Sequence, residues 1–247
     1  GDLGLCLKGV QITVKQSGPA IKIKIEDDPD PWWNALLSWL FIPPFFTLAD
    51  STRKVHFEGD FVFSICCPKW LQIAQEWIPR DHKWLDEDTV KSIVENECHF
   101  VAKSSNINCP LEWRSSFSAA ELKLSPMIKY MRQVYMAFLA LRTLHKEYLV
   151  YVSPALTSYH LKTILYWTLE ETDIASSGKD AQEILTVMLE RLIKSMQEKK
   201  LPNYFIPTQN LYSTFEQDVF QKLQIKLQEM HASPSDFFQT VGHMVCG

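Results

Sequence analysis

The sequence has no excess of positive charge: 25 Lys and Arg face 29 Asp and Glu, which gives a net charge of −4. Proteins that coat nucleic acid indiscriminately are basic overall, because they neutralise many phosphates, so the composition argues against that class. The charge is uneven, however, since the segment from Ser115 to Lys162 has six Lys or Arg against two acids, a local +4. This basic band is a candidate phosphate-binding or duplex-nucleic-acid-binding face, although solvated helix surfaces give the same count. Its cations are Lys123, Lys129, Arg132, Arg142, Lys146 and Lys162.

The six cysteines form no framework of the kind found in secreted domains. The N-terminus also lacks a basic segment followed by an apolar run and a cleavage site, which are the marks of a signal peptide. We therefore expect a reducing, cytoplasmic location. The sequence has neither a Cys-x-x-Cys motif nor a Cys/His cluster at zinc-ligand spacing, and this predicts that no structural zinc is bound.

A long uninterrupted apolar run is also missing. The nearest approach is Trp32–Ala49, which is uncharged and rich in Trp, Leu and Phe. It is at the short limit for a membrane span, and Pro43-Pro44 would break a helix in its middle. We predict no transmembrane span and favour a short helix and loop packed on a sheet. A patch that binds a protein partner or touches lipid is the alternative.

The first part of the chain has the period of β-strands. Val10–Lys15 and Ala20–Glu26 alternate apolar and polar residues around a Ser-Gly-Pro turn, which predicts a hairpin. Val55–Cys66 predicts a longer strand whose second half, where the apolar residues become continuous, forms sheet core. His99–Lys103 predicts another strand.

From Trp70 onward the pattern is helical. Acids at 86–88 would cap a short helix at its positive end, and later apolar residues recur at spacings of three and four. The fold class is therefore α+β, with a β-containing N-terminal lobe followed by a helical C-terminal lobe. The further predicted helices are Pro126–Lys146, Thr157–Glu171, Lys179–Lys199, Glu216–Met230 and Ser233–Val245.

Three motifs follow one another in the second half of the chain: Trp-Arg-Ser-Ser-Phe-Ser-Ala-Ala-Glu at 113–121, Ser-Tyr-His-Leu-Lys-Thr at 158–163 and Leu-Pro-Asn-Tyr-Phe-Ile-Pro at 201–207. In this order they resemble the Mab (male-abnormal-twenty-one) family, which includes cyclic GMP-AMP synthase. The resemblance spans roughly residues 18–211. It implies a partial nucleotidyltransferase core lobe over 1–112, with an apolar insertion at about 27–54, and a helical Mab-type lobe over 113–247.

Metal-dependent catalysis in this family implies two Mg²⁺ or Mn²⁺ ions held by three carboxylates. Asp60, in Glu-Gly-Asp-Phe-Val-Phe, lies where the third carboxylate belongs, and a strand-edge acid is its alternative interpretation. No acidic pair behind a Gly-Ser turn precedes it. A single Asp holds magnesium poorly, so we expect the core lobe to be incomplete and the chain to be inactive as written.

The resemblance also implies nucleotide contacts in the cleft between the lobes. Arg114 would bind a phosphate or a base edge through its planar fork, and hydroxyls of the same motif would contact sugar or base. An alternative from the residues themselves is a capping box, since Ser118 precedes Glu121 by three positions. The residues that this motif assigns to a nucleotide are Arg114, Ser116, Ser118 and Glu121.

Tyr159 matches a family tyrosine that stacks on a nucleobase, with Ser158 beside it, and ordinary burial of an aromatic side chain is the alternative. Lys129 and Arg132 lie where the family places a lysine that reaches the triphosphate, and the register of one continuous helix favours Arg132. Lys162 belongs to the same motif as Tyr159.

His160, beside Tyr159, is interpreted as structural. The 201–207 motif is interpreted as a structural loop whose Tyr, Phe and Ile fill a pocket. The family's zinc loop follows the counterpart of Glu121, whereas here residues 122–126 run directly into a helix, which again predicts no zinc.

Two functions remain open. The first is a protein related to cyclic GMP-AMP synthase-like receptors, which sense a ligand on the helical face and make a cyclic dinucleotide from ATP and GTP. The second is a non-catalytic family member that binds protein partners or a structural nucleotide. The missing carboxylates favour the second, whereas the retained Arg114 to Glu121 motif and Tyr159 favour the first lineage.

Overall fold

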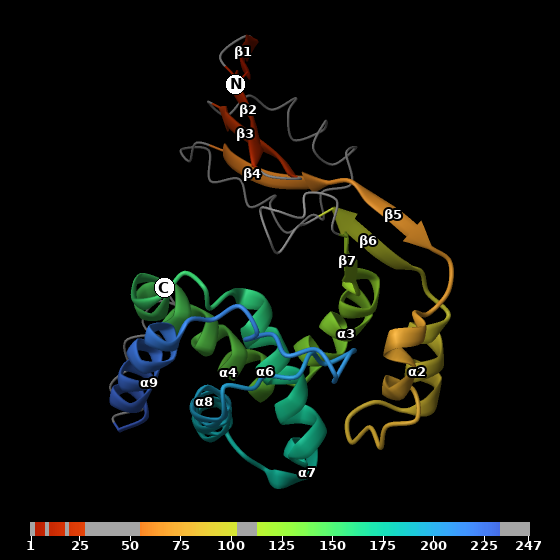
Figure 1. Cartoon of the computed structure of the whole chain (residues 1–247), viewed down its shortest axis with the longest axis vertical. Coiled ribbons are helices and arrows are strands. Elements are labelled where there is room, and N and C mark those ends of the chain that lie inside the picture. Colours follow the sequence, from red (N-terminus) through yellow and green to blue (C-terminus); the bar gives the residue numbers. More distant parts are fainter. Residues whose placement is uncertain (1–2, 8–9, 18–19, 28–54, 103–112, 233–247) are drawn as a thin grey trace. The chain divides into compact units, whose positions relative to one another are not determined.

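The computed structural model describes residues 3–7, 10–17, 20–27, 55–102 and 113–232 (Figure 1). Side chains are described for residues 63–102, 113–174 and 177–232. The chain divides into two compact units, which we call the strand unit (Gly1–Cys66 and His99–Ser116) and the helical unit (Cys67–Cys98 and Phe117–Gly247). The predicted apolar insertion and the predicted C-terminal helix lie outside the described residues.

The strand unit contains a four-stranded antiparallel sheet in which neighbouring strands follow one another along the chain. The predicted hairpin is confirmed, because β2 and β3 pair from Gln11 with Glu26 to Ser17 with Ala20. A first strand, β1, was not predicted. The strands are β1 (Leu3–Leu7), β2 (Val10–Ser17), β3 (Ala20–Asp27) and β4 (Val55–Val62).

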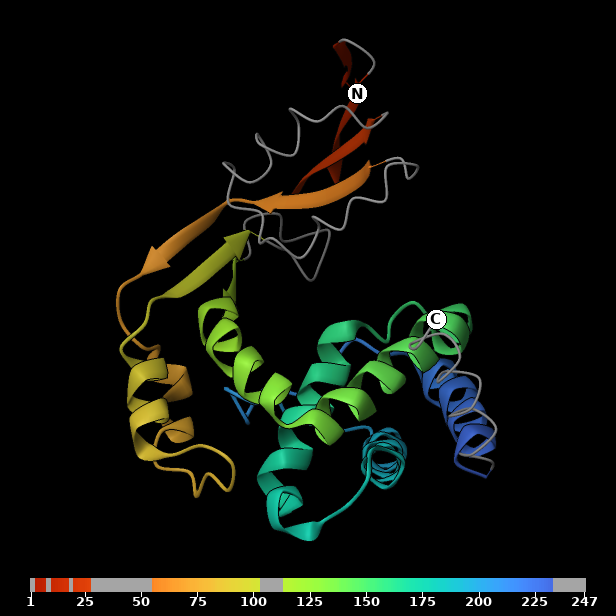
Figure 2. The ribbon, with the colours of Figure 1, turned by 180° about the vertical axis from the view of Figure 1, so that it is seen from behind.

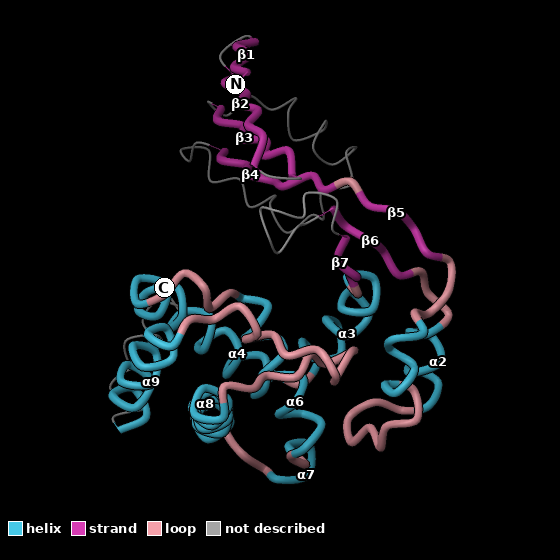
Figure 3. The backbone as a smooth tube through the Cα atoms, in the orientation of Figure 1, coloured by secondary structure: helices cyan, strands magenta, loops and turns pink. Residues whose placement is uncertain are grey.

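The prediction of one long strand over Val55–Cys66 is wrong. The segment forms β4 and then β5 (Ser64–Cys67), with a short break at Phe63 (Figure 3), and β5 joins a second sheet in the order β5-β6-β7. The second half of this segment does not form core: Phe63, at the break, is 74% exposed and Ile65 of β5 is 55% exposed. The predicted strand near His99 is confirmed. It is β6 (Cys98–Ala102), and it pairs antiparallel with β7 (Trp113–Ser116).

The helical unit is built around α8, which packs against α4, α6 and α9 (Figure 1). The predicted acidic cap is confirmed, because Asp86 accepts a hydrogen bond of 2.7 Å from the amide of Thr89. Within the described residues, no helix combines the length and apolar character that a membrane crossing requires. The elements are η2 (Gln72–Trp77), α2 (Glu87–Val94), α3 (Ser118–Tyr130), α4 (Arg132–Leu144), a π-helical turn η3 (His145–Leu149), α5 (Val150–Val152), α6 (Ser158–Glu171), α7 (Ile174–Ser177), α8 (Ala181–Glu198) and α9 (Gln217–Ala232).

The single helix predicted over Pro126–Lys146 is also wrong. The chain leaves helical geometry at Met131, where φ is −79° and ψ is 76°, and this residue separates α3 from α4 (Figure 2). Pro126 lies inside α3 rather than at its start, so its missing amide hydrogen did not mark the boundary. The break changes the helix register between Lys129 and Arg132, on which the choice between these two cations depended.

The loop at 201–207 fills the centre of the helical unit, as predicted. Tyr204 and Phe205 are 1% exposed and Ile206 is 6% exposed. The side-chain oxygen of Asn203 accepts hydrogen bonds from the amides of Phe205 (3.0 Å) and Ile206 (3.3 Å), so the loop backbone is satisfied within the core. Around it, aromatic rings of several elements gather with centroid separations typical of tilted and stacked pairs.

Beside this loop lies a buried ion pair between Glu170 of α6 and His82, whose side chains are 4% and 5% exposed. Glu170 also accepts from Trp84 (3.1 Å) and Tyr204. Burial alone would raise the pKa of Glu170, but the hydrogen bonds from His82, Tyr204 and Trp84 together hold it below its ordinary value. The second ring nitrogen of His82 faces the carbonyl oxygen of Trp77 at 2.9 Å. Both ring nitrogens thus lie within hydrogen-bonding distance of oxygen atoms, one of Glu170 and one of Trp77.

His160 is structural, as predicted, and closes the first turn of α6. Its Nδ1 accepts a hydrogen bond of 2.9 Å from the amide of Thr157, the N-cap residue. The neutral ring therefore carries its hydrogen on Nε2, which faces the carbonyl oxygen of Leu211 at 3.4 Å. Burial, which outweighs the hydrogen bonds, lowers the pKa of His160 from 6.5 to about 4.

This cap predicts a dependence of stability on pH. In the unfolded chain His160 takes up a proton below about pH 6.5, whereas in the folded chain it does so only near pH 4. The free energy of unfolding therefore falls as the pH is lowered through this window. We expect wild type to lose about 2 kcal/mol more than His160→Gln between pH 7 and pH 5, at about 1.4 kcal/mol per pH unit. Glutamine can fill the same capping position without titrating. Urea unfolding at both pH values measures the difference, and parallel losses in the two proteins would contradict the assignment.

Candidate functional site

A cavity of about 470 Å³ lies among α3, α4 and α6, wholly within the helical unit. Its floor is apolar and buried, and its rim is polar. Three of the rim residues are cations, and none of the lining residues is a carboxylate. The floor consists of Ile128, Phe138, Leu165 and Tyr166, and the rim consists of Ser125, Lys129, Tyr135, Arg142, Ser158 and Lys162.

Helical periodicity explains why these residues share one cavity. On α6 the lining residues are spaced by four, three and one, from Ser158 to Tyr166, which places them on one face. The lining residues of α3 and α4 follow the same spacing of three and four. The three helices thus each present one stripe, and side chains far apart in the sequence meet.

An ion pair between Glu121 and Lys162 joins α3 to α6 beside the cavity. The carboxylate is 15% exposed and the ammonium is 36% exposed. α3 begins at Ser118 with Phe117 as its N-cap residue, and no side chain caps it. The capping-box alternative for Ser118 and Glu121 is therefore wrong, because Glu121 is directed to Lys162 instead.

Tyr159 lies at the first turn of α6, next to the cavity residue Ser158. The Nζ atom of Lys162 lies 5.9 Å from its ring centroid, within range of a cation–π contact. The Tyr159 hydroxyl accepts a hydrogen bond of 3.3 Å from the side-chain amide of Asn203. The ring is half-buried and lies outside the set that lines the cavity.

Lys129 lines the cavity, whereas Arg132 is exposed and does not. The break at Met131 is the physical reason, because register counted through a continuous helix does not apply across it. Arg142, at the last turn of α4, lines the cavity as well. It belonged to the basic band in the sequence, but no spacing argument singled it out.

The floor of the cavity is kept uncharged. Burial raises the pKa of the Tyr166 phenol, and the charges of Glu121 and Tyr159 raise it further. Tyr166 therefore remains a neutral hydroxyl at physiological pH and adds no negative charge beneath the three cations.

The other predicted residues lie in the strand unit, except Ser118, which is the exposed first residue of α3 and does not line the cavity. Arg114 and Ser116 occupy alternate positions of β7, opposite Val101 and His99, and alternate residues share one face of a strand. Arg114 is exposed and Ser116 is half-buried. All lining residues of the cavity lie in the helical unit.

Asp60 lies on β4, and its side chain is outside the described part. The register places Lys22 opposite Asp60 and Lys24 opposite Glu58. Opposite charges at facing positions are typical of cross-strand pairs, whereas a two-metal centre needs several carboxylates together. Among the described strands the register places a lysine opposite each of these acids, and we derive no catalytic step through a Mg²⁺ or Mn²⁺ pair.

Comparison with known proteins gives matches to two family models. A Mab-21 protein nucleotidyltransferase domain matches residues 6–124, and a Mab-21 protein HhH/H2TH-like domain matches residues 123–229. Among curated proteins, a cyclic GMP-AMP synthase-like receptor of Nicrophorus vespilloides is 28% identical over 144 residues, which is 56% of this chain and 36% of that protein. Protein mab-21-like 3 of Danio rerio is 25% identical over 84 residues, which is 34% of this chain and 22% of that protein. The matched segments thus span about a third of one relative and a fifth of the other.

Proposed function

This chain belongs to the Mab-21 family, and from that premise we propose that its helical unit binds a nucleotide of the ATP or GTP kind in the cavity among α3, α4 and α6. The observation that carries the proposal is the lining of that cavity, with three cations, no carboxylate and a buried apolar floor. Such a lining suits a ligand that has several negative charges at one end and a flat apolar group at the other.

Three lining residues and two residues beside the cavity have definite tasks in this proposal. Lys129 and Lys162 neutralise phosphate oxygens, and the Ser158 hydroxyl donates a hydrogen bond to one of them. Glu121 holds the Lys162 ammonium in place through their ion pair. Tyr159 stacks on the base, which is worth about 1–3 kcal/mol for aromatic stacking on a nucleobase.

For the whole protein we propose a nucleotide-binding member of the nucleotidyltransferase fold. A non-catalytic role is the candidate that the strand register favours, because Asp60 is paired in register with Lys22. The positions of the cations in the basic band favour binding of a small anion over binding of duplex nucleic acid. Three of the six cations line the cavity, and a fourth, Lys123, donates hydrogen bonds to Ser92 of α2.

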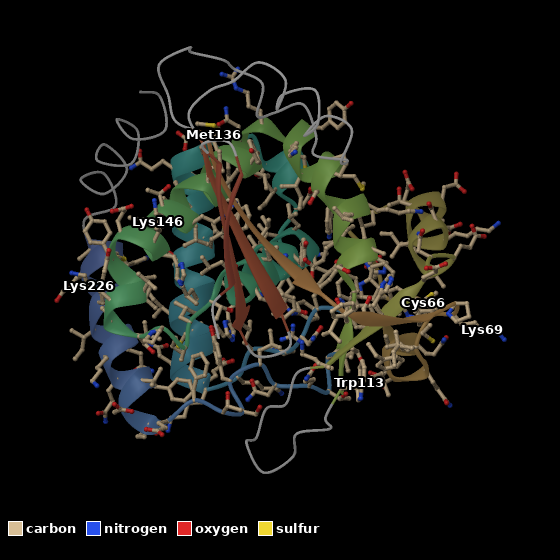
Figure 4. The ribbon with its side chains drawn as sticks, turned by 90° about the horizontal axis from the view of Figure 1, so that it is seen from above. Cys66, Lys69, Trp113, Met136, Lys146 and Lys226 are labelled. Carbon is tan, nitrogen blue, oxygen red and sulfur yellow. The ribbon has the colours of Figure 1, made fainter. Side chains whose placement is uncertain are left out.

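Titration of ATP and GTP tests the proposal. Lys129→Gln and Tyr159→Ala should each weaken binding by about tenfold or more, which corresponds to about 1.4 kcal/mol. Lys146→Gln is the matched control: this lysine belongs to the same basic band (labelled in Figure 4), but its side chain is 83% exposed and lies outside the cavity lining. Affinity that is unchanged in both Lys129→Gln and Tyr159→Ala would sink the assignment of the site.

A further inference from the structure

We propose that Arg142 makes the cavity selective for nucleoside triphosphates over monophosphates. The inference rests on the proposed function and names the part of the ligand that the site distinguishes, the length of the phosphate chain. Arg142 lies in the last turn of α4 and is an exposed residue on the cavity rim.

Position along α4 is the first argument. Tyr135, Phe138 and Arg142 are spaced by three and four and line the cavity as one stripe. At about 1.5 Å per residue, Arg142 lies about 10 Å along the helix axis from Tyr135. The cavity therefore extends along α4, with Arg142 at one end of the stripe, which is the geometry that an elongated chain of phosphates requires.

Charge is the second argument. The three rim cations come from three different helices. A single phosphate group bound against one helix would therefore leave the cations of the other helices without an anionic partner. Lys162 already has Glu121 as a partner. Among the described residues, the ion pairs do not include Arg142, so its charge is not neutralised by a carboxylate there.

The chemistry of the guanidinium group is the third argument. Its planar fork donates two parallel hydrogen bonds to phosphate oxygens, whereas a lysine ammonium acts as a point charge. Each additional phosphate adds negative charge. Lys129 and Lys162 can neutralise the charge of a monophosphate, whereas a triphosphate needs a further cation. Because the break at Met131 leaves Arg132 outside the lining, Arg142 is the cation that α4 contributes to the cavity.

The experiment compares ATP, ADP and AMP by isothermal titration with wild type and Arg142→Gln. Wild type should bind ATP more tightly than AMP. In Arg142→Gln the ratio of ATP to AMP affinity should fall by about tenfold or more, while AMP affinity changes by less than about threefold. Arg142→Lys keeps the charge without the planar fork, so its ratio of ATP to AMP affinity should lie between those of wild type and Arg142→Gln.

Arg132→Gln is the matched control, because it removes the same charge from the same helix at an exposed position outside the lining. Its ratio should equal that of wild type. If Arg142→Gln keeps the wild-type ratio, the inference is overturned and nucleotide binding stands. If wild type binds none of the three nucleotides, the proposed function itself fails, and this inference fails with it.

Discussion

Replacement of Glu170 by alanine is expected to lower the free energy of unfolding by about 3–5 kcal/mol, the usual cost of removing one partner of a buried ion pair. Glu170 is the common acceptor for His82, Trp84 and Tyr204. Its loss leaves Nδ1 of His82 without its hydrogen-bond partner in a place that is 5% exposed. Urea unfolding followed by tryptophan fluorescence measures the change.

The matched variant is Glu170→Gln, which keeps the shape and one acceptor oxygen but removes the charge. We expect a smaller loss than in the alanine variant, because Trp84 or Tyr204 can still donate to the amide oxygen. The double variant Glu170→Gln with His82→Gln should recover part of that loss, since the buried imidazole without its partner is gone. A loss below about 1 kcal/mol in Glu170→Ala would contradict a stabilising role for this buried pair.

This network also borders the floor of the cavity. Tyr166 lies on the same helix as Glu170, one turn earlier, and its ring centroid is 5.0 Å from that of Tyr204. The rings of Trp84 and Tyr166 are stacked, with centroids 6.2 Å apart. Two donors to Glu170 thus pack against the aromatic floor of the cavity.

Local patterns in the sequence predicted much of the fold. Alternation identified the β2–β3 hairpin, and periodicity identified α6, α8 and α9 within two residues at each end. The acidic cap of α2 could be located because its hydrogen bond joins residues only three apart. In these cases the cause of the structure lies within one turn or one strand.

The errors have a different origin. The change of sheet at Phe63 falls within a continuous apolar run, and the break at Met131 falls where no Gly or Pro marks it. Tertiary packing decided both, so they could not be read from a local window.

The same limit applies to the candidate site. The contact between His82 and Glu170 joins residues 88 positions apart, and no spacing rule connects them. Lys129, Ser158 and Lys162 were found because they lie in or near the motifs, whereas Arg142 required the three-dimensional face of α4.

Replacement of Phe205 by alanine should also be costly, with an expected loss of about 3–5 kcal/mol for a buried aromatic side chain. Phe205 is 1% exposed, and its ring stacks on that of Phe117 with centroids 4.7 Å apart. Its ring also lies near those of Tyr204 at 5.2 Å, Trp77 at 5.5 Å, Trp70 at 6.0 Å and Tyr166 at 6.5 Å. Urea unfolding measures the loss, and Phe205→Leu, which keeps most of the volume, should lose clearly less.

The stack has a further consequence, because Phe117 is the N-cap residue of α3 and Glu121 follows it by one turn. A cavity left at position 205 lets Phe117 shift, and with it the start of the helix that presents Glu121 to Lys162. Phe205→Leu should therefore weaken ATP binding by more than Leu223→Val, a comparable loss of volume in α9, where Leu223 is fully buried outside the cavity lining. Equal ATP affinities in these two folded variants would show that the stack stabilises the helical unit without positioning the ion pair.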